Sequence, residues 1–159
     1  MNKAFLLIGG NLGNRKLNLS KARSIIHQRC GNIIKSSSLY ETAAWGDVVQ
    51  ASFLNQVLVI QTRLTAADLL QCMLHAEQKM GRVRRQNSGP RTIDIDLLFF
   101  NDDIIKMTGL EVPHPRLHLR KFVLEPLNEV APGYIHPVFQ KPISQLLAEC
   151  PDNLPVQKL

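Results

Sequence analysis

Hydrophobic and polar positions along the chain form two kinds of periodic pattern. Apolar or alternating stretches, typical of β-strands with at least one buried face, span residues 4–8, 33–40, 53–62 and 93–100. Apolar residues recur every three or four positions in residues 15–29 and 66–80, which predicts two amphipathic helices. Thr65 lies directly before the second helix and is followed three residues later by Asp68, as in a capping box that begins a helix.

These elements follow one another in the order strand, helix, strand, strand, helix, strand. The order predicts an α+β fold with a ferredoxin-like βαββαβ core, in which both helices pack on one face of an antiparallel sheet. A hairpin partner for the last strand is expected near Ile104 and Ile105, and extra C-terminal helices are expected at residues 122–130 and 143–149. The sequence shows no repeat or linker, so residues 1–159 are expected to form a single domain.

Two aspartates, Asp94 and Asp96, interrupt the otherwise apolar strand at 93–100. Because side chains alternate between the two faces of a strand, both carboxylates point the same way, with their Cα atoms about 6.5–7 Å apart. Ile95 and its hydrophobic neighbours point the other way, toward a core. Burying two carboxylates is costly, so the pair indicates a site for divalent cations, in particular Mg²⁺, which binds one or two carboxylates together with phosphate oxygens. An edge strand with a solvated outer face is the alternative explanation of an isolated pair of this kind.

The segment before this strand is basic and contains no acidic residue from position 78 to position 92. Its basic side chains are Lys79, Arg82, Arg84, Arg85 and Arg91. Arginine binds phosphate oxygens in a bidentate manner, and carboxylates for a metal beside arginines for phosphate are the arrangement that phosphoryl transfer requires. A second basic segment contains His114, Arg116, Arg120 and Lys121, directly followed by Phe122. These two segments predict a site for a polyphosphate.

Composition and charge fit an enzyme that binds a small anionic ligand. The chain has 159 residues, 45% of them hydrophobic and 20% charged, and no apolar run approaches the length of a membrane span. The formal net charge of +6 fits either a nucleic-acid-binding protein or an enzyme with a triphosphate substrate. The positive charge is concentrated in the two basic segments, which favours the second. Cys30, Cys72 and Cys150 are widely separated and odd in number, so we expect reduced thiols and a cytoplasmic protein.

Phe53 and Asn55 lie two residues apart in the strand at 53–62 and therefore share a face. The phenyl ring can stack on a ligand while the amide forms hydrogen bonds with it. A core phenylalanine beside an amide at the edge of a ladder is the alternative explanation. The chain contains no P-loop motif, which excludes a nucleotide site of that class.

Several short motifs occur in the order found in one enzyme family. The most specific are Gly-Arg-Val-Arg at 81–84 and Gly-Pro-Arg-Thr-Ile-Asp-Ile-Asp-Leu-Leu at 89–98. Supporting motifs are Ile-Gly-Gly-Asn-Leu-Gly at 8–13, Ser-Leu-Tyr-Glu-Thr at 38–42, Phe-Leu-Asn at 53–55, Val-Pro-His-Pro-Arg at 112–116 and Arg-Lys-Phe-Val-Leu-Glu-Pro-Leu at 120–127. With these motifs most of the chain, roughly residues 4–132, resembles the 6-hydroxymethyl-7,8-dihydropterin pyrophosphokinase family of folate biosynthesis.

The resemblance implies that the chain transfers the β,γ-pyrophosphoryl group of ATP to the hydroxymethyl group of 6-hydroxymethyl-7,8-dihydropterin and releases AMP. It implies that Asp94 and Asp96 hold two Mg²⁺ ions and that, with them, Arg82 and Arg91 act in catalysis. The residues implied around ATP are Glu77, Arg84, Leu97, His114 and Arg120. Those implied around the pterin are Thr42, Trp45, Phe53, Asn55 and Phe122. The expected partners are these two small molecules, with no nucleic acid and no membrane, and the chain is expected to be a monomer.

The chain departs from the family pattern at four positions. Ser88 stands where some members have Trp, Leu74 where some have Gln, Gly109 where some have Arg, and Pro115 where some have Tyr. These differences concern closure over the pterin and contacts with adenosine, and they leave the aspartates and the phosphate-binding arginines unaffected. The alternative function is a basic ferredoxin-like module that binds RNA, although carboxylates on its sheet would repel the phosphates.

Overall fold

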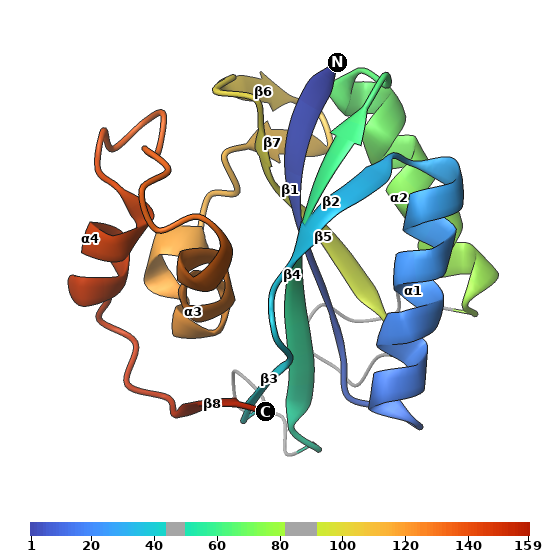
Figure 1. The fold of residues 1–159 in the computed structure, drawn as a ribbon, viewed down its shortest axis with the longest axis horizontal. Coiled ribbons are helices and arrows are strands. Elements are labelled where there is room, and N and C mark those ends of the chain that lie inside the picture. Colours follow the sequence, from blue (N-terminus) through green and yellow to red (C-terminus); the bar gives the residue numbers. More distant parts are fainter. Residues whose placement is uncertain (44–49, 82–91) are drawn as a thin grey trace.

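The computed structural model describes residues 1–43, 50–81 and 92–159 (Figure 1). In chain order its elements are β1 (Asn2–Gly10), α1 (Arg15–Arg29), β2 (Asn32–Ser36), β3 (Tyr40–Thr42), β4 (Phe53–Thr62), α2 (Ala66–Lys79), β5 (Asp94–Phe100), β6 (Ile105–Met107), β7 (Leu110–Val112), the 3-10 helix η1 (Leu117–Leu119), α3 (Lys121–Val130), α4 (Ile143–Ala148) and β8 (Val156–Lys158). The chain is thus a mixed α and β protein, as predicted at the level of fold class.

Local capping signals determine where the first two helices begin. At the start of α1 the Asn14 side chain accepts a hydrogen bond from the backbone N–H of Leu17, at 3.1 Å. At the start of α2 the Thr65 hydroxyl accepts one from the N–H of Asp68, also at 3.1 Å, as the capping-box pattern predicted. Gly81 follows α2 with a φ of +79°, a conformation that favours glycine and ends the helix near the predicted position.

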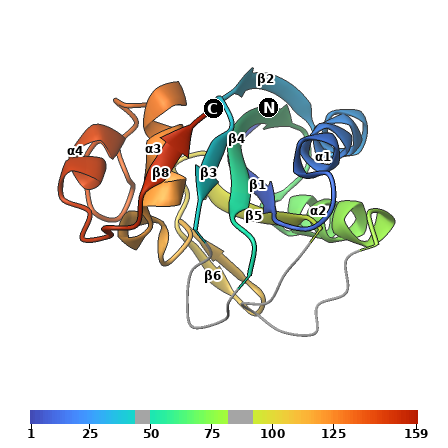
Figure 2. The ribbon, with the colours of Figure 1, turned by 90° about the horizontal axis from the view of Figure 1, so that it is seen from below.

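The main sheet is antiparallel in every pairing, with strand order β5-β1-β4-β3-β8 and with β2 also paired to β4. The ten-residue strand β4 pairs with β3 at its N-terminal end and with β2 at its C-terminal end. Helices α1 and α2 cover one face of the sheet, and α3 and α4 lie on the opposite side (Figures 1 and 2). The central strands β1 and β4 are therefore buried on both faces.

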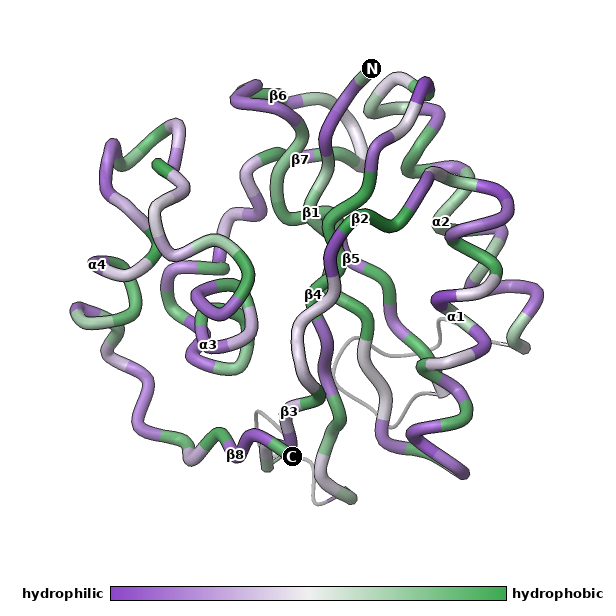
Figure 3. The backbone as a smooth tube through the Cα atoms, in the orientation of Figure 1, coloured by the Kyte–Doolittle hydropathy of each residue, from purple (hydrophilic) through white to green (hydrophobic). Residues whose placement is uncertain are grey.

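Each face of the sheet packs into its own hydrophobic cluster. The cluster under α1 and α2 includes Ala4, Leu6, Ile8, Leu54, Leu58, Ile60, Ile95 and Leu97 from the strands. The cluster under α3 includes Phe5, Leu7, Val57, Val59 and Leu98 from the strands, together with Val123, Leu124 and Leu127. Hydrophobic and hydrophilic positions alternate around the turns of α1 and α2 (Figure 3), as expected for helices with one buried face. Burial of each large apolar side chain stabilises the fold by about 1.5–3 kcal/mol.

One predicted strand is divided in two. The stretch at 33–40 forms β2 and β3, because the chain leaves the regular ladder at the buried residue Ser37. The Ser37 hydroxyl accepts a hydrogen bond from the N–H of Val57 at 2.9 Å, and its carbonyl accepts one from the Gln56 side chain at 2.7 Å. The Ser37 side chain makes the first of these contacts with β4 and its backbone makes the second, so the alternation of hydrophobic and polar residues alone did not reveal the break.

The predicted hairpin between β5 and a strand near Ile104 and Ile105 was wrong. Ile105 begins β6, which pairs with β7 in a separate two-stranded sheet, whereas β5 pairs with β1. After β5 the chain turns at Asn101, which has a φ of 50° and whose N–H donates to the carbonyl of Lys3 at 2.7 Å. The turn signal that decides the true hairpin is Gly109, with a φ of +78° between β6 and β7.

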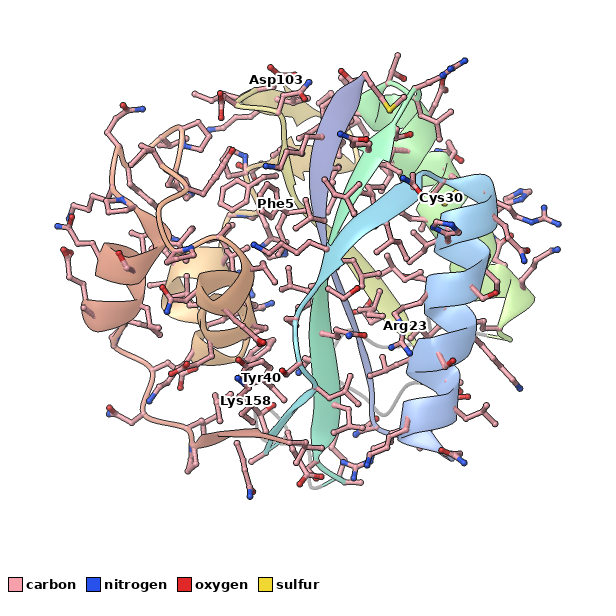
Figure 4. All side chains as sticks on the ribbon, in the orientation of Figure 1. Phe5, Arg23, Cys30, Tyr40, Asp103 and Lys158 are labelled. Atoms are coloured by element: carbon pink, nitrogen blue, oxygen red, sulfur yellow. A yellow bond between two sulfur atoms is a disulfide. The ribbon has the colours of Figure 1, made fainter. Side chains whose placement is uncertain are left out.

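The prediction of reduced thiols was wrong for two of the three cysteines. Cys30, labelled at the end of α1 in Figure 4, forms a disulfide with Cys72 of α2, with their Cα atoms 5.8 Å apart. Cys150 is free and half-buried. The 42-residue separation of the paired cysteines carries no local signal, and only the packing of α1 beside α2 brings them together. Across the described ranges, no helix has the length and hydrophobicity needed to span a lipid bilayer.

Candidate active site

Strand β5 presents Asp94 and Asp96 on the face of the sheet that α3 covers. The register places Asp94 opposite Gly9 and Asp96 opposite Leu7 of β1, and Leu7 belongs to the cluster under α3. Both aspartates are half-buried, whereas Ile95 between them is 4% exposed and packs under α1 and α2. The predicted division of faces is confirmed.

A row of residues crosses the sheet at this level. Asp94 lies opposite Gly9, Gly9 opposite Asn55 of β4, and Asn55 opposite Tyr40 of β3. A Cβ atom on Gly9 would lie 2.1 Å from Oδ1 of Asn55, so the Asn55 amide fills the space that a side chain at position 9 would need. Because neighbouring strands are about 4.8 Å apart, the backbones of Asn55 and Asp94 are about 10 Å from one another, and the Asn55 amide extends over Gly9 toward Asp94.

Strands β3 and β4 bring further predicted residues to the same face. Thr42 pairs with Phe53, and Thr42 and Asn55 are only 4% and 5% exposed. The phenolic O–H of Tyr40 donates to Oε1 of Glu129 on α3, at 2.7 Å, and Tyr40 points from β3 toward α3 in Figure 4. Thr42, two residues further along β3, therefore faces α3 as well.

The N-terminus of α3 completes this group. Arg120 is the N-cap residue, and its guanidinium carbon lies 5.7 Å from the centroid of the Phe122 ring. Phe122 is half-buried and packs against the hydrophobic cluster under α3, which also contains Val57 of β4. Four of the five residues predicted around the pterin, Thr42, Phe53, Asn55 and Phe122, thus lie between the sheet and α3.

Glu77 ties the last turn of α2 to the aspartate strand. It is 2% exposed, and its Oε2 atom accepts a hydrogen bond from the backbone N–H of Ile95 at 2.8 Å. The acceptor thus holds β5 at the residue between the two aspartates. Leu97, by contrast, is 6% exposed and belongs to the cluster under α1 and α2, on the face opposite Asp94. Glu77 therefore contacts the backbone between the two aspartates, whereas Leu97 lies on the opposite face of the sheet from them.

His114 is held beside β5 as a neutral side chain. Its backbone N–H donates to the carbonyl of Leu98 at 3.0 Å, and its Nδ1 atom accepts a hydrogen bond from the N–H of Arg116 at 3.2 Å. Burial and the nearby Arg120 cation lower the pKa of His114 to about 4, although the Asp94 carboxylate opposes this. With Nδ1 as acceptor, the proton of the neutral ring lies on Nε2, which makes that atom a donor.

Comparison with known proteins identifies the family to which the chain belongs. The family model described as 7,8-dihydro-6-hydroxymethylpterin-pyrophosphokinase (HPPK) matches residues 5–132. The chain belongs to the HPPK family. The predicted resemblance is confirmed, and the matched residues contain every candidate site residue named above.

Two bacterial members of the HPPK family match along most of their length. An Aquifex aeolicus protein named 2-amino-4-hydroxy-6-hydroxymethyldihydropteridine pyrophosphokinase is 39% identical, over 94% of this chain and 92% of that protein. The Bacillus subtilis protein of the same name is 42% identical, over 81% of this chain and 78% of that protein. The folic acid synthesis protein fol1 of Schizosaccharomyces pombe is 36% identical over 97% of this chain, which spans only 21% of that protein.

Solved structures of HPPK-containing proteins share the fold. A Plasmodium falciparum HPPK-DHPS solved with pterin and p-hydroxybenzoate superposes with a TM-score of 0.77, at 20% identity and over 93% of this chain. A double variant of the same protein superposes with a TM-score of 0.79. The chain spans 41% and 43% of those two structures, so the likeness concerns their HPPK part and shows the fold alone.

Several HPPK candidates lie outside the described residues. They are Trp45, Arg82, Arg84 and Arg91, with Ser88 among the departures. In the sequence, residues 82–91 come between the end of α2 and the start of β5. Their assignments stay predictions.

Among the other departures, Gly109 has a structural explanation. Its φ of +78° forms the turn between β6 and β7, and a Cβ there would meet no atom within 4 Å. Position 109 thus serves a hairpin in this member of the family. Leu74 is half-buried on α2 and Pro115 is exposed after the turn that carries His114.

The sequence patterns missed polar residues that position the loops around the site. Asn11 is 4% exposed, and its side-chain amide donates to Oε1 of Gln50 at 2.9 Å and to the carbonyl of Ala51 at 2.8 Å. Arg15 forms an ion pair with Glu41 of β3, at 2.6 Å. Asn11 belongs to the glycine-rich turn after β1, which is the signal that could have indicated it. The partner of Arg15 lies 26 positions away, where no local pattern reaches.

Proposed function

We propose that this HPPK family member transfers the β,γ-pyrophosphoryl group of ATP to the hydroxymethyl group of 6-hydroxymethyl-7,8-dihydropterin and releases AMP, in folate biosynthesis. The observation that carries the proposal, beside family membership, is the row Asp94, Gly9, Asn55. It places a carboxylate for metal and phosphate and a buried amide on one face of the sheet, with only Gly9 between their backbones, so both groups can face one ligand between the sheet and α3.

The pterin is proposed to bind between the sheet and α3. Phe53 and Phe122 would contact its two ring faces, since both lie on this side of the sheet. Asn55 carries both a donor and an acceptor, and with Thr42 it would hydrogen-bond the edge of the ring. Both polar residues are at most 5% exposed, so a ring edge bound there would be shielded from water, which strengthens its hydrogen bonds. Trp45 is proposed as the remaining contact.

The donor set at β5 fits Mg²⁺. Asp94 and Asp96 offer hard oxygen ligands on one rigid strand. Within the described residues, no group of three or more His, Cys, Asp or Glu side chains could hold a metal ion. The two aspartates are proposed to hold two ions together with substrate oxygens, and bound Mg²⁺ would supply neutralisation of the triphosphate charge.

The ATP triphosphate is proposed to lie beside the N-terminal end of β5. Neutral His114, with its proton on Nε2, would donate to a phosphate oxygen, and Arg120 would add a positive charge. Arg82, Arg84 and Arg91 are proposed to bind the transferred group and the triphosphate. Glu77 is proposed to act through β5, because its carboxylate already accepts the N–H of Ile95. Leu97 would contact adenosine only at the edge of the sheet.

Finer features of the molecule belong to the same proposal. The unit β1-α1-β2/β3-β4-α2-β5 is proposed to be ferredoxin-like, with α3 and α4 as additions, and residues 1–159 are proposed to form one domain. The chain is proposed to act as a monomer in the cytoplasm, without nucleic-acid partners. A disulfide such as that between Cys30 and Cys72 is uncommon in the cytoplasm, so whether these two thiols are oxidised bears on the proposed compartment.

The nucleotide product tests the proposal directly. Incubation with ATP, Mg²⁺ and 6-hydroxymethyl-7,8-dihydropterin is expected to yield AMP and the pterin pyrophosphate, resolved by anion-exchange chromatography. Formation of ADP instead of AMP would reject pyrophosphoryl transfer. Tight, salt-sensitive RNA binding that ATP does not displace would favour the RNA-binding alternative.

The aspartate pair supplies the matching variants. Asp94→Asn and Asp96→Asn should each lower kcat by about 10²–10³-fold, since loss of a charge that stabilises the transition state has effects of this size. Asp103→Asn, an exposed aspartate in the turn after β5, is the matched control and should retain full activity. Equal activity of all three variants would contradict the proposed role of β5.

A further inference from the structure

The C-terminal segment, residues 150–159, contacts two walls of the proposed pterin site. It lies beyond residue 132, where the match to the family model ends. One contact is made by Asp152 at the N-terminus of α3, and the other by β8 along β3. Figures 1 and 2 both show β8 lying beside β3, with α3 next to it.

Asp152 caps α3 from outside the helix. Its Oδ2 atom accepts a hydrogen bond from the backbone N–H of Lys121 at 3.0 Å, and its Oδ1 atom accepts one from the N–H of Leu154 at 2.9 Å. The helix's own N-cap residue, Arg120, makes no capping hydrogen bond with its side chain. Asp152 is 9% exposed, so its carboxylate satisfies a helix-terminal amide in a largely water-excluded place and complements the helix dipole.

This contact bears on the pterin site because Lys121 directly precedes Phe122. The backbone that carries the proposed stacking ring is therefore held at its first helical residue by Asp152. Without that carboxylate the first turn of α3 would have an unsatisfied N–H and would fray more readily. Fraying would move Phe122, whereas Asp94, Asp96 and His114 are held by β5 and its neighbours.

β8 holds the opposite wall. It pairs with β3 along the whole length of that three-residue strand, with Val156 opposite Thr42 and Lys158 opposite Tyr40. Directly opposed side chains in a ladder lie on the same face, so Val156 flanks Thr42. The pairing is extended by the N–H of Leu159, which donates to the carbonyl of Leu39 at 2.9 Å.

A charged contact joins this strand to α3. Lys158 Nζ lies 3.7 Å from Oε2 of Glu129, the same carboxylate that accepts the Tyr40 hydroxyl, and the labelled Lys158 and Tyr40 side chains lie close together in Figure 4. The C-terminal segment thus links β3 to α3, and these are the two elements that carry Thr42 and Phe122.

We propose that Asp152 and β8 are positioning elements for the pterin, with Asp152 acting through Phe122 and β8 through Thr42. Neither touches the reacting groups. The inference rests on the proposed function, since it assigns part of the second substrate's binding wall to residues beyond the span of the family model, 5–132.

Steady-state kinetics of full-length Asp152→Ala tests the inference. The KM for the dihydropterin should rise about five- to tenfold, the effect expected when a helix cap is lost, while kcat and the KM for ATP stay within about twofold. Asp152→Asn keeps one carbonyl acceptor and should recover part of the loss. A merely structural role would lower the active fraction, and so kcat, without a selective change in the pterin KM.

Two further variants make the outcome decisive. Glu149→Ala removes an exposed ion pair with Lys141 in the same C-terminal region and is the matched control, with all constants unchanged. Val156→Pro weakens the β8 ladder without touching Asp152 and should reproduce the rise in the pterin KM even if Asp152→Ala fails to fold. If the wild type produces AMP and both variants fold with an unchanged KM for the dihydropterin, the inference is overturned and the proposed function stands. A wild type that makes no AMP would instead reject the proposed function, and this inference with it.

Discussion

At position 9 the sheet leaves room for one side chain, and the amide of Asn55 occupies that room. A Cβ added at Gly9 would lie 2.1 Å from Oδ1 of Asn55 and 3.0 Å from the carbonyl oxygen of Leu54. Glycine is required there because of this close approach, since its φ is not positive. Position 9 thus bears on the proposed role of Asn55 in pterin binding.

Gly9→Ala should therefore weaken pterin binding selectively. A methyl group at this point would push the Asn55 amide out of place, and losing its hydrogen bonds should raise the KM for the dihydropterin by about tenfold. Gly133→Ala is the control, because a Cβ at Gly133 would meet nothing within 4 Å. Measurement of both KM values in each variant checks this. An unchanged pterin KM in folded Gly9→Ala would show that Asn55 does not depend on position 9.

At the scale of elements, the pairing of α1 with α2 depends on a covalent bond as well as on packing. Cys30 caps the C-terminus of α1, and its N–H donates to the carbonyl of Ile26 at 2.8 Å. Both cysteines belong to or border the hydrophobic cluster under these helices. A bridge that closes a 42-residue loop is expected to stabilise the fold by about 2–4 kcal/mol.

Thiol counting tests the bridge. Titration of protein denatured without reductant should find one thiol per chain, that of Cys150, and titration after reduction should find three. Dithiothreitol should lower Tm, and Cys72→Ser should make Tm insensitive to it. Three titratable thiols in the unreduced protein would mean that Cys30 and Cys72 are free in solution, as their spacing in the sequence suggests.

Elements also show how far local patterns reach. Residues 15–29 and 53–62 formed α1 and β4 with the predicted bounds, because periodicity and caps lie within the segments themselves. Ile105 was assigned to the wrong partner strand, because strand pairing depends on where the chain turns at Asn101 and Gly109. β8 was not predicted at all. Its three residues carry too little pattern, and it exists as a strand only through β3.

At the scale of the whole molecule, a buried histidine couples stability to pH. His136 is 2% exposed, and its Nδ1 atom accepts hydrogen bonds from the N–H groups of Val138 at 3.1 Å and Phe139 at 3.2 Å, which only the neutral ring can do. Burial, together with the charge of His118, lowers the pKa of His136 to about 4. The folded state therefore resists protonation that the unfolded chain accepts at its ordinary pKa of 6.5.

The free energy of unfolding should consequently fall as the pH drops from about 6.5 to about 4. In that range His136 is protonated in the unfolded state and neutral in the folded state. Its contribution to the decrease in the free energy of unfolding is at most about 3 kcal/mol. Urea denaturation at several pH values measures the slope. His136→Gln should flatten the slope, whereas exposed His75→Gln should leave it unchanged. A slope that is the same in both variants would show that other groups cause the loss.

The sequence by itself determined the periodic elements, the Thr65 cap and the shared face of Asp94 and Asp96, because each follows from spacing within a few residues along a helix or strand. It also determined the family, through motifs that occur in order along the chain.

Only the tertiary structure decided which distant groups meet. The Glu77 carboxylate bonds the N–H of Ile95, Cys30 bonds Cys72, and Asp152 bonds the N–H of Lys121, across 18, 42 and 31 positions respectively. A backbone N–H is present at every residue except proline, so no local pattern marks the one that a remote carboxylate will reach. Packing of the helices on the two faces of the sheet makes that choice.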